Sequence, residues 1–465
     1  MEPLGPGFFL VDRHTEIRAP TNATPDAALH IKVVDFLNNA GNRPLRSLEV
    51  RLPDGPSFGA RNLRMTIDGH EVSPQSAEDT DRRLMVAPFD PTWKRNQTRE
   101  IVTEWDLMPE PEGRGTVAVS AEAFYIADET AFPLWQPPTG VFTRGGPIPL
   151  KATLTAITPA EFRVLAPGKP LKPTTVKGMI SHRYQIRPTQ DFFPYVVAGR
   201  YVEQIARTRQ GEVSFWTLHP NDAQQAQIAA ARLADSVKTY TDFFGPATKT
   251  DNIVRVVETP VDLPSEFGEQ GGAGGASFPG GALLDHQALS QGLANESNLQ
   301  LAEYELARTW FGWTVRPAPE TQILLGRGVG LFGLVIAAER RSQDERRRIV
   351  AQLIERYDAT RRIAADKLLL EPPVGYTRAE RISTGYRAAL FFVALEDLCG
   401  RDNLSVAFHE IVHSRGGDTA ADEELRAATE DAYKHDLAPM FRSWLNRPGI
   451  PDDFRARYSN SAGLR

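Results

Sequence analysis

Cysteine is nearly absent from this sequence, since Cys399 is the single one among 465 residues. One cysteine excludes an internal disulfide, and with it the class of small scaffolds that disulfides hold together. A chain of this length does not need such crosslinks, because it can bury sizeable hydrophobic cores. At about 150 residues per domain, the length predicts two or three domains.

Long apolar runs are also absent. No stretch of 18 or more apolar residues occurs, so no segment is expected to span a membrane. The first ten residues lack a basic segment followed by an apolar core, so no signal peptide is recognised. A soluble protein is therefore expected, in a compartment that the sequence leaves open. A periplasmic or secreted location would require that a signal peptide had been removed.

Basic clusters are missing as well. The net charge is −6 and no stretch is dominated by Lys and Arg, so nucleic acid is not an expected partner. Hydrophobic residues make up 41% of the chain and charged residues 24%, which is typical of a folded globular protein.

The first 200 or so residues show the alternation and the turn residues of β-strands. A hairpin is expected at Asp68-Gly69, and no helical periodicity of useful length interrupts the region. The simplest interpretation is an antiparallel β domain. Its clearest strands are expected at 29–36, 47–52, 99–107, 116–126, 150–157 and 181–186.

The pattern changes near Asp222. A helix is expected over 224–243, closed by Gly245-Pro246, and a short strand follows at 253–257. After a Gly-rich segment, 268–281, the chain is predicted to be mostly helical. The helices are expected near 297–312, 322–341, 343–367, 377–399, 402–414, 420–434 and 436–445.

These patterns predict an α+β chain of two domains whose boundary falls within 203–221. The β-rich domain is placed at 1–205 and the mostly helical domain at 206–455. Residues 456–465 form a tail.

One predicted helix carries a recognisable motif. It reads LAEYELARTWFGWTVRP from Leu301 and is followed by ILLGRGVGLFGLVIAAE from Ile323. The pair closely resembles the zinc-binding region of the aminopeptidase N-like zinc metallopeptidases, which are thermolysin-like gluzincins. There the first helix reads roughly HELAHQWFG and the second carries NEGFA. A chance match in a generic amphipathic helix is the alternative, but the register of the second helix argues against it.

The family motif has a chemical reason. Two His at i and i+4 share one helix face and reach one zinc ion, and the Glu between them acts as general base on the zinc-bound water. A Glu of the second helix is the third protein ligand, and water takes the open position.

The resemblance places each of these functions on a residue of this sequence. Glu305 falls at the general base, so it would be a remnant of that group. Tyr304 and Arg308 fall at the two His positions, and Arg327, nineteen residues after Arg308, falls at the third ligand. An arginine stays cationic and repels Zn²⁺, and one phenol does not make a site. No metal is therefore expected among these residues. Instead Glu305 is expected to pair with Arg308, Arg327 or both.

Other parts of the chain extend the resemblance. The ending SWLNRPGIP and the segment FPYVVAGRYV match the family's last helices and the end of its N-terminal β domain. The family's large helical C-terminal domain is absent. The resemblance thus implies a β-sandwich-like domain followed by a thermolysin-like domain.

Two further catalytic groups of the family are missing or displaced. The family's Gly-Ala-Met-Glu-Asn edge, whose Glu holds the substrate amine, falls on Gly271, Gly272, Ala273 and Gly274, with no Glu after Ala273. These residues are interpreted as a remnant of the substrate edge. They are expected to border an open cleft beside the 301–312 helix. The family's tyrosine falls best on Gly385, with Tyr386 one residue off as a doubtful remnant.

A second pattern, His409-Glu410-Ile411-Val412-His413, is a literal HExxH. Its two His share a face, but the apolar Phe408, Ile411 and Val412 lie on another side of the predicted helix. Both His are therefore expected to be exposed and not to share a ligand. A zinc site at His409 and His413 is kept as the alternative.

The sequence thus predicts a non-catalytic relative of these peptidases that binds peptide or protein with a former protease cleft and needs no cofactor. One alternative is an active zinc metallopeptidase with an atypical site, such as His409/His413. Another is a purely structural module.

Overall fold

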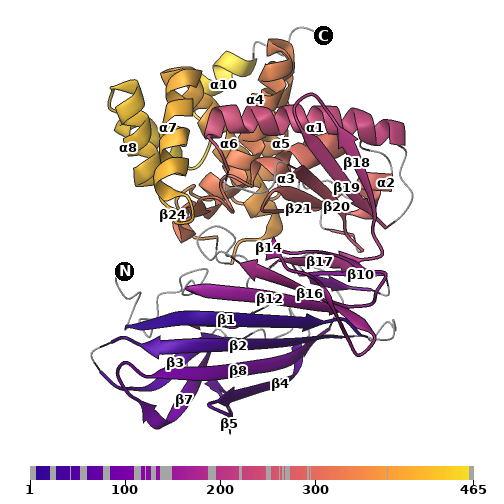
Figure 1. The fold of residues 1–465 in the computed structure, drawn as a ribbon. Coiled ribbons are helices and arrows are strands. Elements are labelled where there is room, and N and C mark those ends of the chain that lie inside the picture. The colour runs from indigo at the N-terminus through magenta and orange to yellow at the C-terminus, as the bar shows by residue number, and fades with distance from the viewer. Residues whose placement is uncertain are drawn as a thin grey trace. The chain divides into compact units, whose positions relative to one another are not determined.

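The protein is represented by a computed structural model (Figure 1). It describes residues 7–20, 28–41, 43–52, 60–76, 84–108, 117–120, 122–126, 132–136, 149–186, 195–218, 223–247, 253–260, 262–263, 267, 273–290, 293, 295–373 and 375–459. The chain divides into two units. The first comprises 1–202 with 259–262, and the second comprises 203–258 with 263–465.

The first unit consists of strands, because its segments alternate between buried apolar and exposed polar residues, as in Leu29–Asn39. Its strands are β1 (Phe8–Arg18), β2 (Leu29–Asn39), β3 (Leu45–Arg51), β4 (Ala60–Ile67), β5 (His70–Val72), β6 (Gln75–Ser76), β7 (Leu84–Trp93), β8 (Thr98–Leu107), β9 (Val117–Val119), β10 (Ala123–Ile126), β11 (Leu134–Gln136), β12 (Lys151–Thr158), β13 (Arg163–Leu165), β14 (Lys169–Pro170), β15 (Thr174–Val176), β16 (Met179–Ile186) and β17 (Val196–Gly199).

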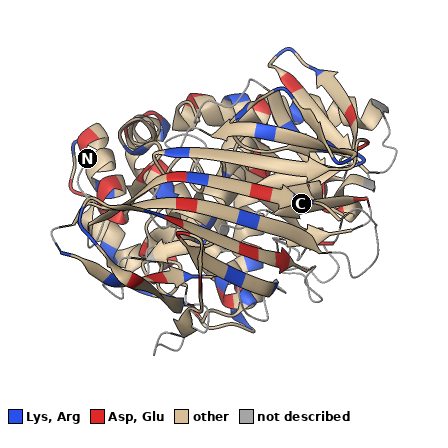
Figure 2. Cartoon of the chain, turned by 60° about the horizontal axis from the view of Figure 1, so that its bottom comes forward, with Lys and Arg blue, Asp and Glu red and all other residues tan. Residues whose placement is uncertain are grey.

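A nine-stranded sheet dominates this unit, in the order β14-β16-β12-β1-β2-β8-β4-β5 with β15 beside β16. Two smaller sheets, β13-β17-β10-β9 and β11-β3-β7-β6, share cores with it. Lys and Arg alternate with Asp and Glu over the face of the large sheet rather than forming a field of one sign (Figure 2). The hairpin at Asp68-Gly69 is confirmed, since β4 and β5 pair across it.

The prediction of a purely antiparallel β domain is wrong in one respect. Strands β1 and β12 pair in parallel over Asp12–Arg18 and Lys151–Ile157, so the large sheet is mixed. Alternation of apolar and polar residues marks a strand but does not encode the direction of its neighbour. The sequence pattern therefore found these strands without finding this pairing.

The second unit packs helices around a five-stranded sheet of order β18-β19-β20-β22-β21. Its elements are β18 (Val202–Arg207), β19 (Glu212–Thr217), α1 (Ala223–Phe244), β20 (Ile253–Glu258), β21 (Gly275–Phe278), β22 (Gly281–Leu284), α2 (His286–Ser290), α3 (Glu296–Ala307), β23 (Arg316–Pro317), the 3₁₀ turn η2 (Pro319–Thr321), the π-helix η3 (Gln322–Gly328), α4 (Val329–Arg341), α5 (Gln343–Arg361), α6 (Arg378–Cys399), α7 (Arg401–Arg415), β24 (Thr419–Ala420), α8 (Asp422–Tyr433), α9 (Ala438–Leu445) and α10 (Asp452–Ser459).

The apolar core of this unit surrounds α3 and α4. Pro319–Arg341 is the one stretch among the described residues that is long and apolar enough to cross a membrane, with a mean hydropathy of 1.6. Of its most apolar 18 residues, 83% are buried inside the protein, as is typical of a helix in a protein core.

Candidate functional site

The candidate site is built on α3, a helix that is buried along almost its whole length. Its N-terminus is capped by Asn295, whose side chain accepts a hydrogen bond from the Ser297 amide at 2.9 Å. Residues 298–307 are all buried. Because neither side faces water, the polar side chains of this helix must find partners inside the protein.

One side of α3 is fixed to its neighbours by Glu303. This fully buried carboxylate accepts hydrogen bonds from Arg232 of α1 at 2.9 Å, from Arg341 of α4 at 3.0 Å and from Ser236 at 2.7 Å. Arg232 also binds Glu296, and its hydrogen bonds lower the pKa of that carboxyl to about 2. This polar clamp sets the position of the helix.

The other side of α3 carries the residues that the family resemblance singles out. Glu305 is fully buried, and Arg308 Nη1 donates a hydrogen bond to its Oε2 at 2.8 Å. The Arg308 side chain remains 32% exposed. A guanidinium group thus lies directly against the carboxylate that the resemblance assigns to the general base.

Two arginines flank the ring of Tyr304. The Cζ atom of Arg308 lies 5.5 Å from the ring centroid and that of Arg327 lies 5.7 Å from it, within the range of cation–π attraction. Gly330 of α4 makes this packing achievable. A Cβ there would lie 2.6 Å from Arg308 Cγ and 2.9 Å from Tyr304 Cε2.

Arg327 passes close to helix α6. It lies on the π-helix η3 and passes over Gly385 of α6, where an added Cβ would come within 2.4 Å of Arg327 Cδ. Its Cζ atom lies near the Tyr304 ring, as described above. The expected ion pair of Glu305 is confirmed for Arg308.

Tyr386 is fully buried and points to a main-chain group. Its hydroxyl donates to the Phe267 carbonyl oxygen at 2.8 Å. The Phe267 ring lies 5.8 Å from that of Tyr304, and Arg356 Cζ lies 4.9 Å from Phe267. The sequence analysis missed Phe267 and Arg356, because neither belongs to the motif and their spacing along the chain carries no signal.

Strand β21 forms the outer edge of the sheet next to Glu305. A Cβ added at Gly275 would meet Glu305 Cγ at 3.1 Å. The Asp285 amide donates to the Gly274 carbonyl, so Gly274 bonds toward β22. Because successive residues of an antiparallel strand bond to opposite sides, the N–H and C=O groups of Gly275 and Ser277 are directed away from β22. Of the predicted edge residues, Ala273 is half-buried and Gly274 buried, whereas Gly271 and Gly272 lie outside the described residues.

The side chains at this site do not fit a zinc ion. Tyr304, Arg308 and Arg327 offer one phenol and two cations, and Arg308 holds Glu305. Within the described ranges, no group of three or more His, Cys, Asp or Glu side chains is arranged to hold a metal. No catalytic step through zinc is therefore derived for this site.

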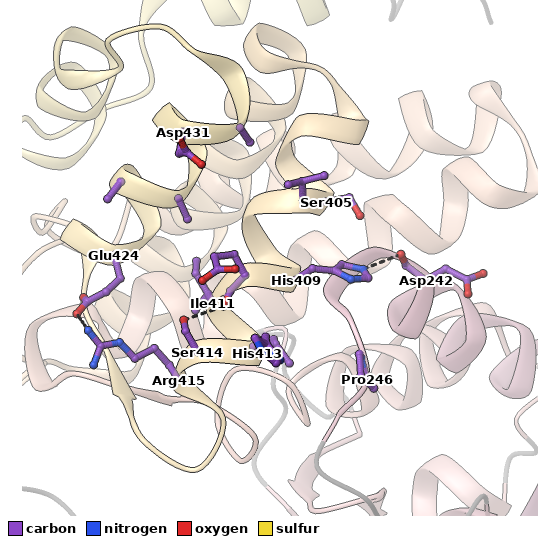
Figure 3. A pocket seen from close by; sticks show the side chains of 16 residues that line it. Asp242, Pro246, Ser405, His409, Ile411, His413, Ser414, Arg415, Glu424 and Asp431 are labelled. Carbon is purple, nitrogen blue, oxygen red and sulfur yellow. Dashed lines mark hydrogen bonds and ion pairs between the residues drawn. The ribbon is translucent and has the colours of Figure 1, made fainter.

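The HExxH sequence lies on α7, beside a cavity of about 1120 Å³ between α7 and α8 (Figure 3). His409 and His413 are both exposed, as predicted. His409 Nε2 donates to the Asp242 carbonyl oxygen at 3.1 Å, at the C-terminal end of α1. Glu424 across the cavity is held by Arg415 at 2.7 Å. The His409 side chain thus links α7 to the end of α1 by a hydrogen bond.

The fold has relatives among solved structures. An M1 zinc metallopeptidase mutant from Deinococcus radiodurans matches with a TM-score of 0.66 and 16% identity, over 96% of each chain. A mutant of that enzyme bound to a Tyr-Ser-Ala substrate matches with a TM-score of 0.67 and 15% identity, over 96% of each chain. A two-domain M1 zinc metallopeptidase mutant bound to L-arginine matches with a TM-score of 0.65 and 16% identity, over 96% of this chain and 95% of the other.

The chain has the two-domain M1 metallopeptidase fold. No protein-family model and no curated protein matches its sequence. At 15–16% identity the likeness establishes the fold alone. The chemistry must therefore be argued from the residues of this chain.

Proposed function

We propose that this protein is a non-catalytic relative of the M1 zinc metallopeptidases that binds extended peptides at the former substrate edge. The observation that carries the proposal is the ion pair of Arg308 with the buried Glu305. A general base must be able to accept a proton from water, and a carboxylate bound to the Arg308 guanidinium is poorly suited to do so.

The binding part of the proposal is supported by the edge strand. Strand β21 ends the sheet, and the main-chain groups of Gly275 and Ser277 are directed toward its outer side. Both residues are buried in the free chain, so a peptide would have to displace what covers them. An extended peptide can add to such an edge through main-chain hydrogen bonds, as in β-augmentation. One solved relative is a mutant bound to a Tyr-Ser-Ala substrate, which supports a peptide as the ligand here.

The first test is peptide binding by isothermal titration calorimetry with the full chain. Ser277→Pro removes an outward N–H group without touching the hydrogen bonds to β22. It is expected to weaken binding of the peptide Ala-Ser-Ala by about tenfold or more, the effect of about 1.4 kcal/mol. Ser277→Ala keeps the main chain and serves as the matched control.

A series of modified peptides tests the same hydrogen bonds on the unchanged protein, in case the proline variant does not fold. Methylating one peptide nitrogen at a time removes the same class of hydrogen bond from the ligand. Alternating losses of affinity along the peptide would support strand addition. Uniform small effects, or no binding at all, would contradict the proposed peptide site.

The non-catalytic part is tested with aminoacyl chromogenic substrates and added zinc. We expect no turnover above that of Glu305→Gln. The alternative of an active zinc hydrolase at His409 and His413 has less support, because His409 Nε2 is already engaged by Asp242. Turnover that disappears in His409→Ala or His413→Ala would favour this alternative. Absence of both turnover and peptide binding would favour a structural module.

A further inference from the structure

The cavity between α7 and α8 is lined by one face of each helix (Figure 3). Residues at the spacing i, i+3, i+4 and i+7 share one side of a helix. On α7 four lining residues have this spacing: Val406, His409, Glu410 and His413. On α8 four others have it: Glu424, Ala427, Ala428 and Asp431. The cavity is therefore a groove that follows about two turns of each helix, or about 10 Å.

The groove has short apolar side chains and is open to solvent. Ala427 is exposed and Ala428 half-buried on the α8 side. Val406 lies on the α7 side and is 59% exposed. Because the distance between two packed helices depends on the side chains at their contact, alanines allow a further helix to come close. Such a surface suits the apolar face of an amphipathic helix.

Carboxylates line both sides of this groove. Glu410 on α7 and Asp431 on α8 are exposed. Asp431 is paired only with the exposed Lys434 of the same segment, and a surface pair of this kind contributes little and exchanges readily. Within the described part of the chain, no cation pairs with Glu410. Arg415, the one arginine of the lining, is held by Glu424 at 2.7 Å.

We propose that the groove between α7 and α8 is a docking site for a partner helix that has a narrow apolar face flanked by Lys or Arg. Its apolar face would pack on Val406, Ala427 and Ala428, and its cations would meet the carboxylates on both sides. An acidic helix would be repelled there. Both walls are helices whose main chain is already hydrogen-bonded, so an extended chain would find no main-chain partners. This site is separate from the peptide site proposed at β21.

Three synthetic peptides of about 15 residues, a length at which isolated helices begin to form, test the proposal by isothermal titration calorimetry with the full chain. The first has Leu and Ala on one helical face and Lys on both flanks. The second has Glu in place of each Lys, and the third has Ser in place of each Leu. The first is expected to bind about tenfold or more tightly than either of the others.

Variants connect this binding to the groove. Ala427→Trp fills the groove without changing its charge and is expected to weaken binding of the first peptide about tenfold. Ala351→Trp makes the same change at an exposed alanine of α5 and is the matched control. Glu410→Gln is expected to weaken binding about threefold, whereas Asp402→Asn, at another exposed carboxylate of α7, should have no effect. Circular dichroism of each variant establishes that it is folded.

Several outcomes would overturn the proposal. Equal affinity for the Lys and Glu peptides would do so, as would no binding of the first peptide at about 1 mM. Equal weakening by Glu410→Gln and Asp402→Asn would show only general attraction to a chain of net charge −6. Self-association in sedimentation velocity that Ala427→Trp abolishes would make the groove an interface between copies instead. None of these results bears on the β21 site, which the Ser277 variants test.

Discussion

At the scale of single residues, the central feature is a buried carboxylate that has a guanidinium for a partner. Glu305 is fully buried and would be costly to leave without a counter-charge. Arg308 supplies that charge from three residues further along the chain, on nearly the same helix face. The pair therefore stabilises the packing of α3.

Removing Arg308 should reveal this dependence. Arg308→Met is expected to lower the free energy of unfolding by about 3 kcal/mol, because it strands a buried charge. Adding Glu305→Gln should recover most of the loss, since the remaining amide is neutral. Urea unfolding of the two single variants and the double variant measures the coupling. Additive effects would show that the ion pair contributes little.

A second prediction concerns Gly385. A methyl group at this position would lie 2.4 Å from Arg327 Cδ and 2.7 Å from its Nε. Gly385→Ala should therefore displace Arg327 and destabilise the protein by about 1–3 kcal/mol. The double variant Gly385→Ala/Arg327→Ala should be less destabilised than the sum of its parts. If Gly385→Ala alone raises the melting temperature, Arg327 does not occupy this space.

The sequence allowed part of this site to be predicted. The pairing of Glu305 with Arg308 follows from helical spacing, and it is present. The path of Arg327 could not be predicted, because it depends on the π-helix and on the room at Gly385. Neither a π-turn nor a contact between separate helices has a local sequence signal. That the three positions once held zinc ligands stays a prediction.

At the scale of elements, α3 is held by the polar clamp on its other side. Glu296 at its first turn is hydrogen-bonded to Arg232, which lowers the pKa of the carboxyl from 4.5 to about 2. A depressed carboxyl pKa contributes stability that is fully present above pH 4.5. That stability is lost as the pH falls toward 2.

Acid titration tests this clamp. The wild-type protein should lose stability as the pH falls from about 4.5 to about 2, and Glu296→Gln should show a shallower dependence in that window. Asp344→Asn, which alters an exposed carboxylate of α5, provides the matched control. Identical slopes for the wild type and Glu296→Gln would contradict the role given to this pair.

The elements themselves were largely predictable. Periodicity located most helices of the second unit, such as α6 within the predicted 377–399. In the structure Thr377 and Glu380 form a capping box at its start. Helix α3 ends at Ala307 rather than at 312, because the chain turns after Arg308. Helices α2 and α10 were missed, since five and eight residues give too weak a pattern. Strand direction in the first unit was not encoded in the alternation.

At the scale of the whole molecule, each unit has hydrophobic clusters of its own, and the fold matches solved M1 zinc metallopeptidases over 96% of the chain. Fold does not fix function, so the side chains of this chain must decide it. We propose that guanidinium charge stands where the metallopeptidases hold their metal.

Zinc content after incubation with excess zinc and gel filtration tests that claim most directly. We compare the wild type with the triple variant Tyr304→His, Arg308→His and Arg327→Glu. We predict far less than one zinc per wild-type chain and about one per chain of the triple variant, because only the latter has two imidazoles and a carboxylate at ligand spacing. About one zinc per wild-type chain that is lost in Glu305→Ala would contradict it.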